Sequence, residues 1–205
     1  MSFNCFKVDK NGNSFKMTKK RICSRVTEPI KSILYIEDLF DKKEAPDVPN
    51  ILKLKKHLVG EGRLDSNLVL KIIEKAIDVF TTEPNLLRLD SPINFVGDIH
   101  GQFYDLLTVL TLGDNPCLFR YLFIGDFVDR GMFSFECICY LFCLKIKYPK
   151  MVYMLRGNHE CRHLTEFFTF RNECLFKANE DVYNNFMLSF DALPLCAIVD
   201  DKFCK

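Results

Sequence analysis

The sequence lacks the features that typify nucleic-acid-binding, membrane-spanning and secreted proteins. Lysine and arginine nearly balance aspartate and glutamate, and a net charge of +1 gives no overall field toward nucleic acid or a membrane surface. Residues 1–20 are polar and contain no apolar core of a signal peptide. The longest apolar stretch, residues 137–144, is far too short to span a bilayer. We therefore expect a soluble cytoplasmic protein without nucleic-acid partners or a membrane span.

The cysteines show no metal-binding or disulfide pattern. There are ten of them, scattered along the chain, and none forms a Cys-x-x-Cys pair. Cys139 and Cys143 are one helical turn apart, a spacing that would suit two metal ligands. We favour the simpler interpretation that these are small buried apolar side chains in a reducing cytosol.

The composition is that of an ordinary globular chain, with 48% hydrophobic and 27% charged residues and no internal repeat. Residues 1–30 are polar and are predicted to be a flexible tail. A basic cluster within this region allows an alternative, a nuclear localisation signal; it comprises Lys16, Lys19, Lys20 and Arg21. Residues 31–90 are predicted to be a helical segment, with helices over 32–40, 50–59 and from 66 to the break at Pro84.

From residue 91 the pattern changes to short apolar strands alternating with helices. Strands are predicted at 93–96, 121–124 and 152–155, with helices at 104–111 and 134–147 between them. Such a βαβαβ order implies right-handed crossovers and neighbouring parallel strands. Two further helices, 166–177 and 179–190, and the start of a fourth strand at 195–199 complete the chain. In sheets of this kind ligands gather beyond the carboxyl ends of the strands.

Three polar motifs lie at those strand ends, and they hold the chemistry of a metal-dependent phosphate enzyme. The motifs are Gly97-Asp98-Ile99-His100-Gly101-Gln102, Gly125-Asp126-Phe127-Val128-Asp129-Arg130-Gly131 and Arg156-Gly157-Asn158-His159-Glu160. The chain has only four histidines, and three of them, His100, His159 and His163, lie in or beside these motifs. The fourth, His57, is expected to be structural or at the surface.

Carboxylate, imidazole and amide oxygen together suit a pair of divalent ions. Asp98 and His100 can point the same way on an extended strand exit, Asp126 can bridge two ions, and Asn158 can serve the second. Arg130 can hold two phosphate oxygens in a bidentate fork. His159 can protonate a leaving alkoxide, and Asp129 can orient its ring. A single motif of this kind is also compatible with a turn after a strand, whereas three in order favour a site.

At these motifs the chain resembles the PPP family of serine/threonine protein phosphatases, whose pattern is Gly-Asp-x-His-Gly, Gly-Asp-x-Val-Asp-Arg-Gly and Gly-Asn-His-Glu. Longer blocks resemble the calcineurin catalytic subunit, from about Leu34 to Phe203. These blocks are residues 58–64, 132–137, 156–170 and 190–195. Phe127 stands where the family usually has tyrosine.

The resemblance implies a fold, a reaction and partners. The fold would be α/β of α+β type, a metallophosphoesterase-like β-sandwich flanked by helices, with residues 91–205 forming its N-terminal βαβαβ half. The reaction would be hydrolysis of phosphoserine and phosphothreonine by a metal-activated hydroxide. The cofactors would be two metal ions, iron and zinc, for which manganese often substitutes. Phosphoproteins would be substrates, and the calcineurin regulatory B subunit and calmodulin would be partners.

Carried over by position, the resemblance assigns a role to each candidate residue. Asp98, His100 and Asp126 would bind the first metal, and Asp126 and Asn158 the second. Arg130 and Asn158 would bind the substrate phosphate. His159, paired with Asp129, would be the proton donor.

The chain departs from the family after the fourth strand, where the family continues into Val-His-Gly-Gly, a further histidine and a second phosphate-binding arginine. We therefore expect a truncated domain, a second metal with only two protein ligands, and no binding segments for the B subunit or calmodulin. Two alternatives to the enzyme remain: a catalytically incomplete fragment or isoform that binds one metal and protein partners, and another metallophosphoesterase such as a nuclease or dinucleotide hydrolase.

Overall fold

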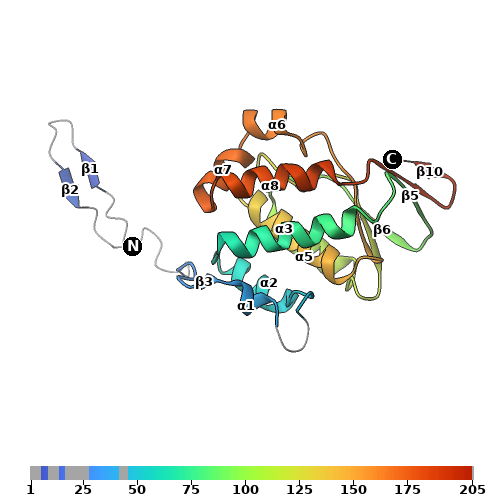
Figure 1. The fold of residues 1–205 in the computed structure, drawn as a ribbon, viewed down its shortest axis with the longest axis horizontal. Helices are drawn as coiled ribbons and strands as arrows, with labels where there is room; N and C mark the ends of the chain where they lie inside the picture. The colour runs from blue at the N-terminus through green and yellow to red at the C-terminus, as the bar shows by residue number, and fades with distance from the viewer. Residues whose placement is uncertain (1–5, 9–13, 17–27, 42–45, 205) are drawn as a thin grey trace.

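The computed structural model describes residues 6–8, 14–16, 28–41 and 46–204 (Figure 1). The predicted flexible tail and its basic cluster lie largely outside these ranges. Within the tail, β1 (Phe6–Val8) and β2 (Ser14–Lys16) pair antiparallel, with Lys7 opposite Phe15. The domain boundaries at residues 30 and 90 stay predictions.

The βαβαβ unit is confirmed. Its elements are β6 (Ile93–Val96), α4 (Phe103–Leu112), β7 (Arg120–Phe123), α5 (Ser134–Lys147) and β8 (Val152–Met154). The three strands form a parallel sheet in the order β6-β7-β8. Val96 lies opposite Phe123, and Phe123 lies opposite Met154, so the three strands end at one edge. The three motifs therefore leave the sheet side by side.

A second three-stranded sheet was only partly predicted. It has the order β10-β9-β5 and consists of β5 (Leu86–Leu89), β9 (Cys196–Val199) and β10 (Phe203–Cys204). The predicted fourth strand, β9, pairs in parallel with β5, which the sequence pattern did not reveal. Leu87, Leu89, Ala197 and Val199 from this sheet form one buried cluster with Leu122 and Leu155. The two sheets thus face each other across a shared apolar layer, as in a β-sandwich.

Helices cover the other side of the parallel sheet. Figure 1 shows α3 (Ser66–Phe80), α5 and α8 (Glu180–Asp191) running alongside one another. One apolar face of α3 is buried, and Asn50 and Asp65 cap α2 (Ile51–Val59) and α3 through their side chains. Phenylalanines join the helices, with the Phe142 ring 5.5 Å from Phe80 and 6.2 Å from Phe186.

Cysteines of α5 are part of this core, as the simpler interpretation predicted. Cys137, Cys139 and Cys143 are fully buried, and burial raises the pKa of all three thiols. Buried thiols of this kind are inert apolar side chains.

In the part of the chain that the structure describes, no helix combines the length and apolar composition that a membrane crossing needs.

Two predicted helices are wrong in detail. Over residues 32–40, Ile33–Leu34 forms β3, which pairs in parallel with β4 (Arg63–Leu64), and only α1 (Ile36–Leu39) is helical. The predicted helix 166–177 is divided into α6 (Arg162–Phe167) and α7 (Phe170–Lys177). The break has a cause in the second motif: the backbone N–H groups of Thr169 and Phe170 donate to the Asp129 carboxylate instead of continuing a helix.

Candidate metal and phosphate site

The three motifs converge at the carboxyl edge of the parallel sheet. The backbone N–H groups of Ile99 and His100 both donate to the Asp126 carbonyl, at 3.0 and 2.9 Å. The N–H of Gly131 in turn donates to the His100 carbonyl at 2.9 Å. The first and second loops are therefore held together by their backbones, and the predicted ligands lie in one place.

The third motif joins them through a very close contact between backbones. A Cβ added at Gly157 would lie 2.3 Å from the Asp126 nitrogen, so only glycine fits at this position. The N–H of His159 donates to Asp126 Oδ1 at 3.0 Å. Asp126, the predicted bridging ligand, is thus held by a neighbour from the third loop.

His100 has one ring nitrogen free to bind a metal, close to the Asp126 carboxylate. His100 Nδ1 lies 2.8 Å from the Val128 carbonyl oxygen, and because a carbonyl can only accept, Nδ1 carries the proton. Nε2 then keeps its lone pair for a metal, an arrangement that metal-binding histidines commonly show. This Nε2 lies 3.9 Å from Asp126 Oδ2 and 3.8 Å from Asp98 Oδ2.

His159 lies beside this group and is almost fully buried. Its Nδ1 lies 2.8 Å from Asp129 Oδ2, so Nδ1 donates to the carboxylate and Nε2 remains available. The His100 and His159 rings meet edge to face, with centroids 4.6 Å apart. Asp129 is fully buried, and its other oxygen accepts the N–H groups of Thr169 and Phe170. The predicted pairing of Asp129 with His159 is present.

The predicted ligands differ in how tightly they gather. Donor atoms of His100, Asp126 and His159 all lie within 4.8 Å of one another. Asp98 lies outside this tight group, and its side chain is 63% exposed. Asn158 and Arg130 are exposed as well. His163 is exposed and has no part in the group.

Backbone conformation marks this edge of the sheet as a site. His100, Asp126, Asp129 and Arg130 have φ values of 44°, 56°, 69° and 66°, in the left-handed region that non-glycine residues rarely adopt. Each costs on the order of 1 kcal/mol and persists only where the surroundings enforce it. Such backbone conformations cluster at functional sites, and the sequence pattern gave no sign of these four.

Sequence reasoning assigned no role to Glu160, the last residue of the third motif. Its carboxylate is fully buried and accepts three backbone N–H groups: Asp126 at 2.7 Å, Phe127 at 2.8 Å and Gly157 at 2.9 Å. Burial raises the pKa of Glu160 to about 7, although these N–H groups favour the charged form. The signal available in the sequence was an acidic residue directly beside His159.

Arg156, the first residue of the third motif, has no role predicted from the sequence either. Its Nε donates to the Glu160 carbonyl at 2.9 Å, and its guanidinium pairs with Asp191 of α8, also at 2.9 Å. Arg162 pairs with the other oxygen of Asp191. The third loop is therefore fastened to α8 from outside the site.

The remaining histidine, His57, is buried, and its Nε2 lies 2.8 Å from the Arg63 carbonyl oxygen, as expected for a structural residue.

The donor set fits divalent metal ions. One carboxylate, of Asp126, and two imidazoles, of His100 and His159, bring donor atoms within 4.8 Å of one another, and the exposed residue Asn158 precedes His159 on the same loop. A phosphate could approach from the exposed side, where Arg130 is accessible. The arrangement is suited to binding a metal and a phosphate and to moving a proton at His159.

Comparison with known proteins agrees with this chemistry. Residues 91–204 match the protein-family model of the calcineurin-like phosphoesterases. Over 96% of its length the chain is 42% identical to serine/threonine-protein phosphatase 2B catalytic subunit A1 of Saccharomyces cerevisiae, of which it covers 37%. Catalytic subunit A2 of the same organism is 41% identical over 91% of the chain and is 30% covered.

One solved structure is similar over most of the chain. It is a protein serine/threonine phosphatase of Saccharomyces cerevisiae, described as similar to human phosphatase PP5. The TM-score is 0.69 at 34% identity, with 72% of this chain and 49% of that chain covered. The chain thus spans about a third of the length of the two curated relatives and half of this structure.

Proposed function

The chain belongs to the calcineurin-like phosphoesterase family, and from that premise we propose that it provides the metal-binding and proton-donating half of a protein serine/threonine phosphatase. The observation that carries this proposal is the pairing of His159 with buried Asp129 at 2.8 Å, directly beside the group of His100 and Asp126. A carboxylate commonly orients a metal-binding histidine too, so the pair supports proton transfer together with the family relation. A protonated imidazole held in this way can protonate a leaving group.

In this proposal Asp98, His100 and Asp126 hold the first metal ion, and Asp126 and Asn158 hold the second. Iron and zinc are the metals we propose, with manganese as a substitute. When bound, such ions acidify a water molecule and neutralise phosphate charge. The family relation and the His100–Asp126–His159 group support divalent metal binding in general.

The protein side chains then position the substrate and move one proton. Arg130 receives the phosphate oxygens in a bidentate fork, aided by the Asn158 amide. A water oxygen attacks phosphorus, and the bond from phosphorus to the serine or threonine oxygen breaks. The water protons leave with the phosphate, which returns one of them to His159 after the reaction. The protonated His159 gives its Nε2 proton to that departing oxygen, and the Asp129 carboxylate balances the charge on the ring while holding Nδ1. The products are inorganic phosphate and the free hydroxyl group.

Phosphoproteins are the proposed substrates, and the similarity to catalytic subunits of phosphatase 2B supports this choice. We also propose that the whole protein works with a regulatory B subunit and calmodulin, as the calcineurin resemblance implies. A cytoplasmic location, with nuclear entry through the basic cluster as the alternative, is proposed as well. Imaging a fluorescent fusion tests the location.

The deciding experiment measures turnover of a phosphoserine peptide by the purified 205-residue chain with added manganese, beside Asp126→Asn. Manganese binding is measured by calorimetry in the same samples. We expect turnover and manganese binding in the unaltered chain, and the loss of both in Asp126→Asn. A folded chain that binds manganese without turnover would instead favour the alternative, a catalytically incomplete metal-binding form. A chain that binds no manganese would overturn the assignment of the site.

A further inference from the structure

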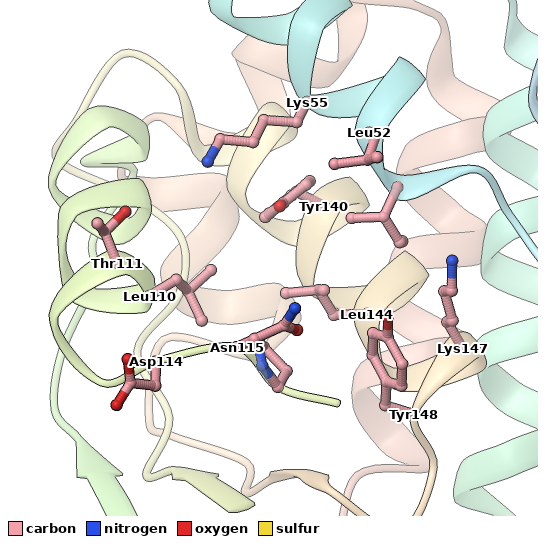
Figure 2. Close-up of a pocket in the computed structure, with 12 residues that line it drawn as sticks. Leu52, Lys55, Leu110, Thr111, Asp114, Asn115, Tyr140, Leu144, Lys147 and Tyr148 are labelled. Atoms are coloured by element: carbon pink, nitrogen blue, oxygen red, sulfur yellow. The ribbon is translucent and has the colours of Figure 1, made fainter. Parts of the chain in front are cut away.

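A cavity of about 390 Å³ lies among helices α2, α4 and α5. Figure 2 shows the side chains of α2, of the C-terminal part of α4 and of the C-terminal part of α5 turned toward it. Its apolar walls come from Ile51 and Leu52 of α2, Leu110 of α4, and Tyr140 and Leu144 of α5. The volume is within the range of sites that enclose a ligand or an anchoring side chain.

The cavity lies away from the metal and phosphate site. Helix α4 begins at Phe103, two residues after Gly101, and α5 begins at Ser134, three residues after Gly131. At 1.5 Å per residue, the first lining residue of α4, Leu110, lies about 10 Å along the helix from Phe103, and that of α5, Tyr140, lies about 9 Å from Ser134. A ligand in the cavity would therefore leave the carboxyl edge of the sheet open.

The charge around the cavity is positive. Lys55 and Lys147 line it, and within the described residues neither forms an ion pair with an acidic side chain. Helix α2 contains three lysines and no acidic residue. Asp114 is the single acid among the twelve lining residues, and Figure 2 shows it beside Leu110, on the far side from Lys147. Lys147 also stabilises the C-terminus of α5, whereas Lys55 lies inside a helix and has no such role.

Exposed apolar side chains extend the surface beyond the cavity. Leu52 lines the cavity and is 80% exposed, and Leu112, next to the lining residue Thr111, is 80% exposed too. Exposed leucines around a pocket are typical of surfaces that bind a protein segment through several side chains. A small molecule held in the cavity alone would leave both leucines in water.

We propose that this cavity docks an acidic amphipathic segment of a partner protein. One leucine or phenylalanine of that segment enters the space between Leu110, Tyr140 and Leu144. Its neighbouring carboxylates meet Lys55 and Lys147, and its remaining apolar residues cover Leu52. The proposal goes beyond the phosphatase activity and needs neither bound metal nor turnover.

The test uses two fluorescent synthetic peptides with the same leucine and phenylalanine residues on one helical face. One carries glutamate on the other face and the second carries lysine there. Fluorescence anisotropy with the full 205-residue chain, without added metal, should show saturable binding of the acidic peptide. The basic peptide should bind at least about tenfold more weakly, because it places like charges beside Lys55 and Lys147. Added salt should weaken the acidic complex.

Matched variants locate the binding. Lys55→Ala and Leu52→Ser should each weaken the acidic peptide about tenfold, as truncation of an interface anchor does. Lys56→Ala changes a neighbouring exposed lysine of α2 that does not line the cavity, and it should leave affinity within about twofold. Thermal unfolding midpoints of all three variants should match the unaltered chain, since none of these side chains is buried.

Several outcomes would overturn the proposal. Equal affinities of the two peptides would contradict the role of the lysines. Equal losses of affinity in Lys55→Ala and Lys56→Ala would show that the peptide binds outside the cavity. Binding of octanoate at the cavity, seen as chemical-shift changes of its lining residues, without any peptide binding would assign it to a small amphiphile. Concentration-dependent dimerisation that Leu52→Ser abolishes would assign it to a second copy of the chain.

Discussion

The buried carboxylate of Glu160 accepts a 2.7 Å hydrogen bond from the backbone N–H of Asp126, the predicted bridging ligand. The same carboxylate accepts the N–H groups of Phe127 and Gly157. One side chain of the third motif thus determines the backbone of the second motif, and with it the direction of the Asp126 side chain. The metal ligands depend on a residue that need not touch a metal.

Replacing Glu160 with glutamine should disturb the site without changing a ligand. The amide nitrogen would face at least one backbone N–H, so a buried donor loses its acceptor, at a cost of about 1–3 kcal/mol. We expect a lower free energy of unfolding and weaker manganese binding. Urea titration and calorimetry measure the two effects, with the exposed Glu166→Gln as the control. Unchanged manganese affinity in Glu160→Gln would contradict the positioning role.

Changing Asp129 to asparagine separates proton transfer from metal binding. In the native protein one carboxylate oxygen of Asp129 accepts from the His159 ring, and the other accepts from two backbone N–H groups. An asparagine amide has only one acceptor oxygen and cannot serve both. Turnover of a phosphoserine peptide should fall about 10²–10⁴-fold, the usual contribution of a positioned general acid. Manganese affinity should stay within about twofold, because Asp129 is not a ligand. If manganese binding falls as far as in Asp126→Asn, His159 acts as a metal ligand and the assignment as proton donor fails.

Lys145 is a buried charge whose loss should be costly. Its ammonium group is fully buried, pairs with Glu83 and donates to the carbonyl oxygens of Pro149 and Val152. Burial lowers its pKa despite the carboxylate. Lys145→Met should lower the free energy of unfolding by about 3 kcal/mol, because it leaves the partly buried Glu83 carboxylate without its partner.

Chemical denaturation checks this value, with the exposed Lys150→Met as the control. The double variant Lys145→Met with Glu83→Gln should recover part of the loss, since it removes the uncompensated charge. A double variant as unstable as the sum of both single variants would show that the two side chains do not interact.

Alkaline pH should destabilise the fold through Tyr140. Burial raises the pKa of this phenol from 10.0 to about 12. Because the pKa is raised in the folded state, the unfolded chain loses its phenol proton at a lower pH than the folded chain does. The stability that the buried neutral phenol contributes is therefore complete below pH 10, and it is lost as the pH rises toward 12. Unfolding free energies measured across this window should fall less steeply in Tyr140→Phe. The exposed Tyr35→Phe should keep the slope of the unaltered chain. Equal slopes in all three proteins would contradict a buried phenol.

Much of the fold followed from local pattern. Short apolar runs that end in Gly-Asp or Gly-Asn specify strands that give way to loops, and the handedness of βαβ units brings their ends to one edge. The predictions for β6 and α5 match the structure in both bounds. The same reasoning predicts Asp98, His100, Asp126 and Asn158 at that edge.

The sequence missed features that depend on partners far along the chain. Strand β5, Leu-Leu-Arg-Leu, contains a charged residue, and its partner β9 is more than a hundred residues away, with Leu86 opposite Cys196. The break between α6 and α7 is caused by Asp129, a residue of the second motif. Neither can be read from a local window, because the interaction that decides it lies elsewhere.

The amino-acid sequence alone determined which chemical groups this protein brings to the strand ends, because residue type and strand periodicity are local properties. The tertiary structure determined how those groups are arranged: the tautomer of His100, the left-handed backbone at Asp126 and Asp129, and the burial of Glu160 beneath two loops. These features require hydrogen bonds between segments about 30 residues apart. A pattern along the chain cannot encode such bonds, since their free energy depends on which groups meet after folding and how far water is excluded from them.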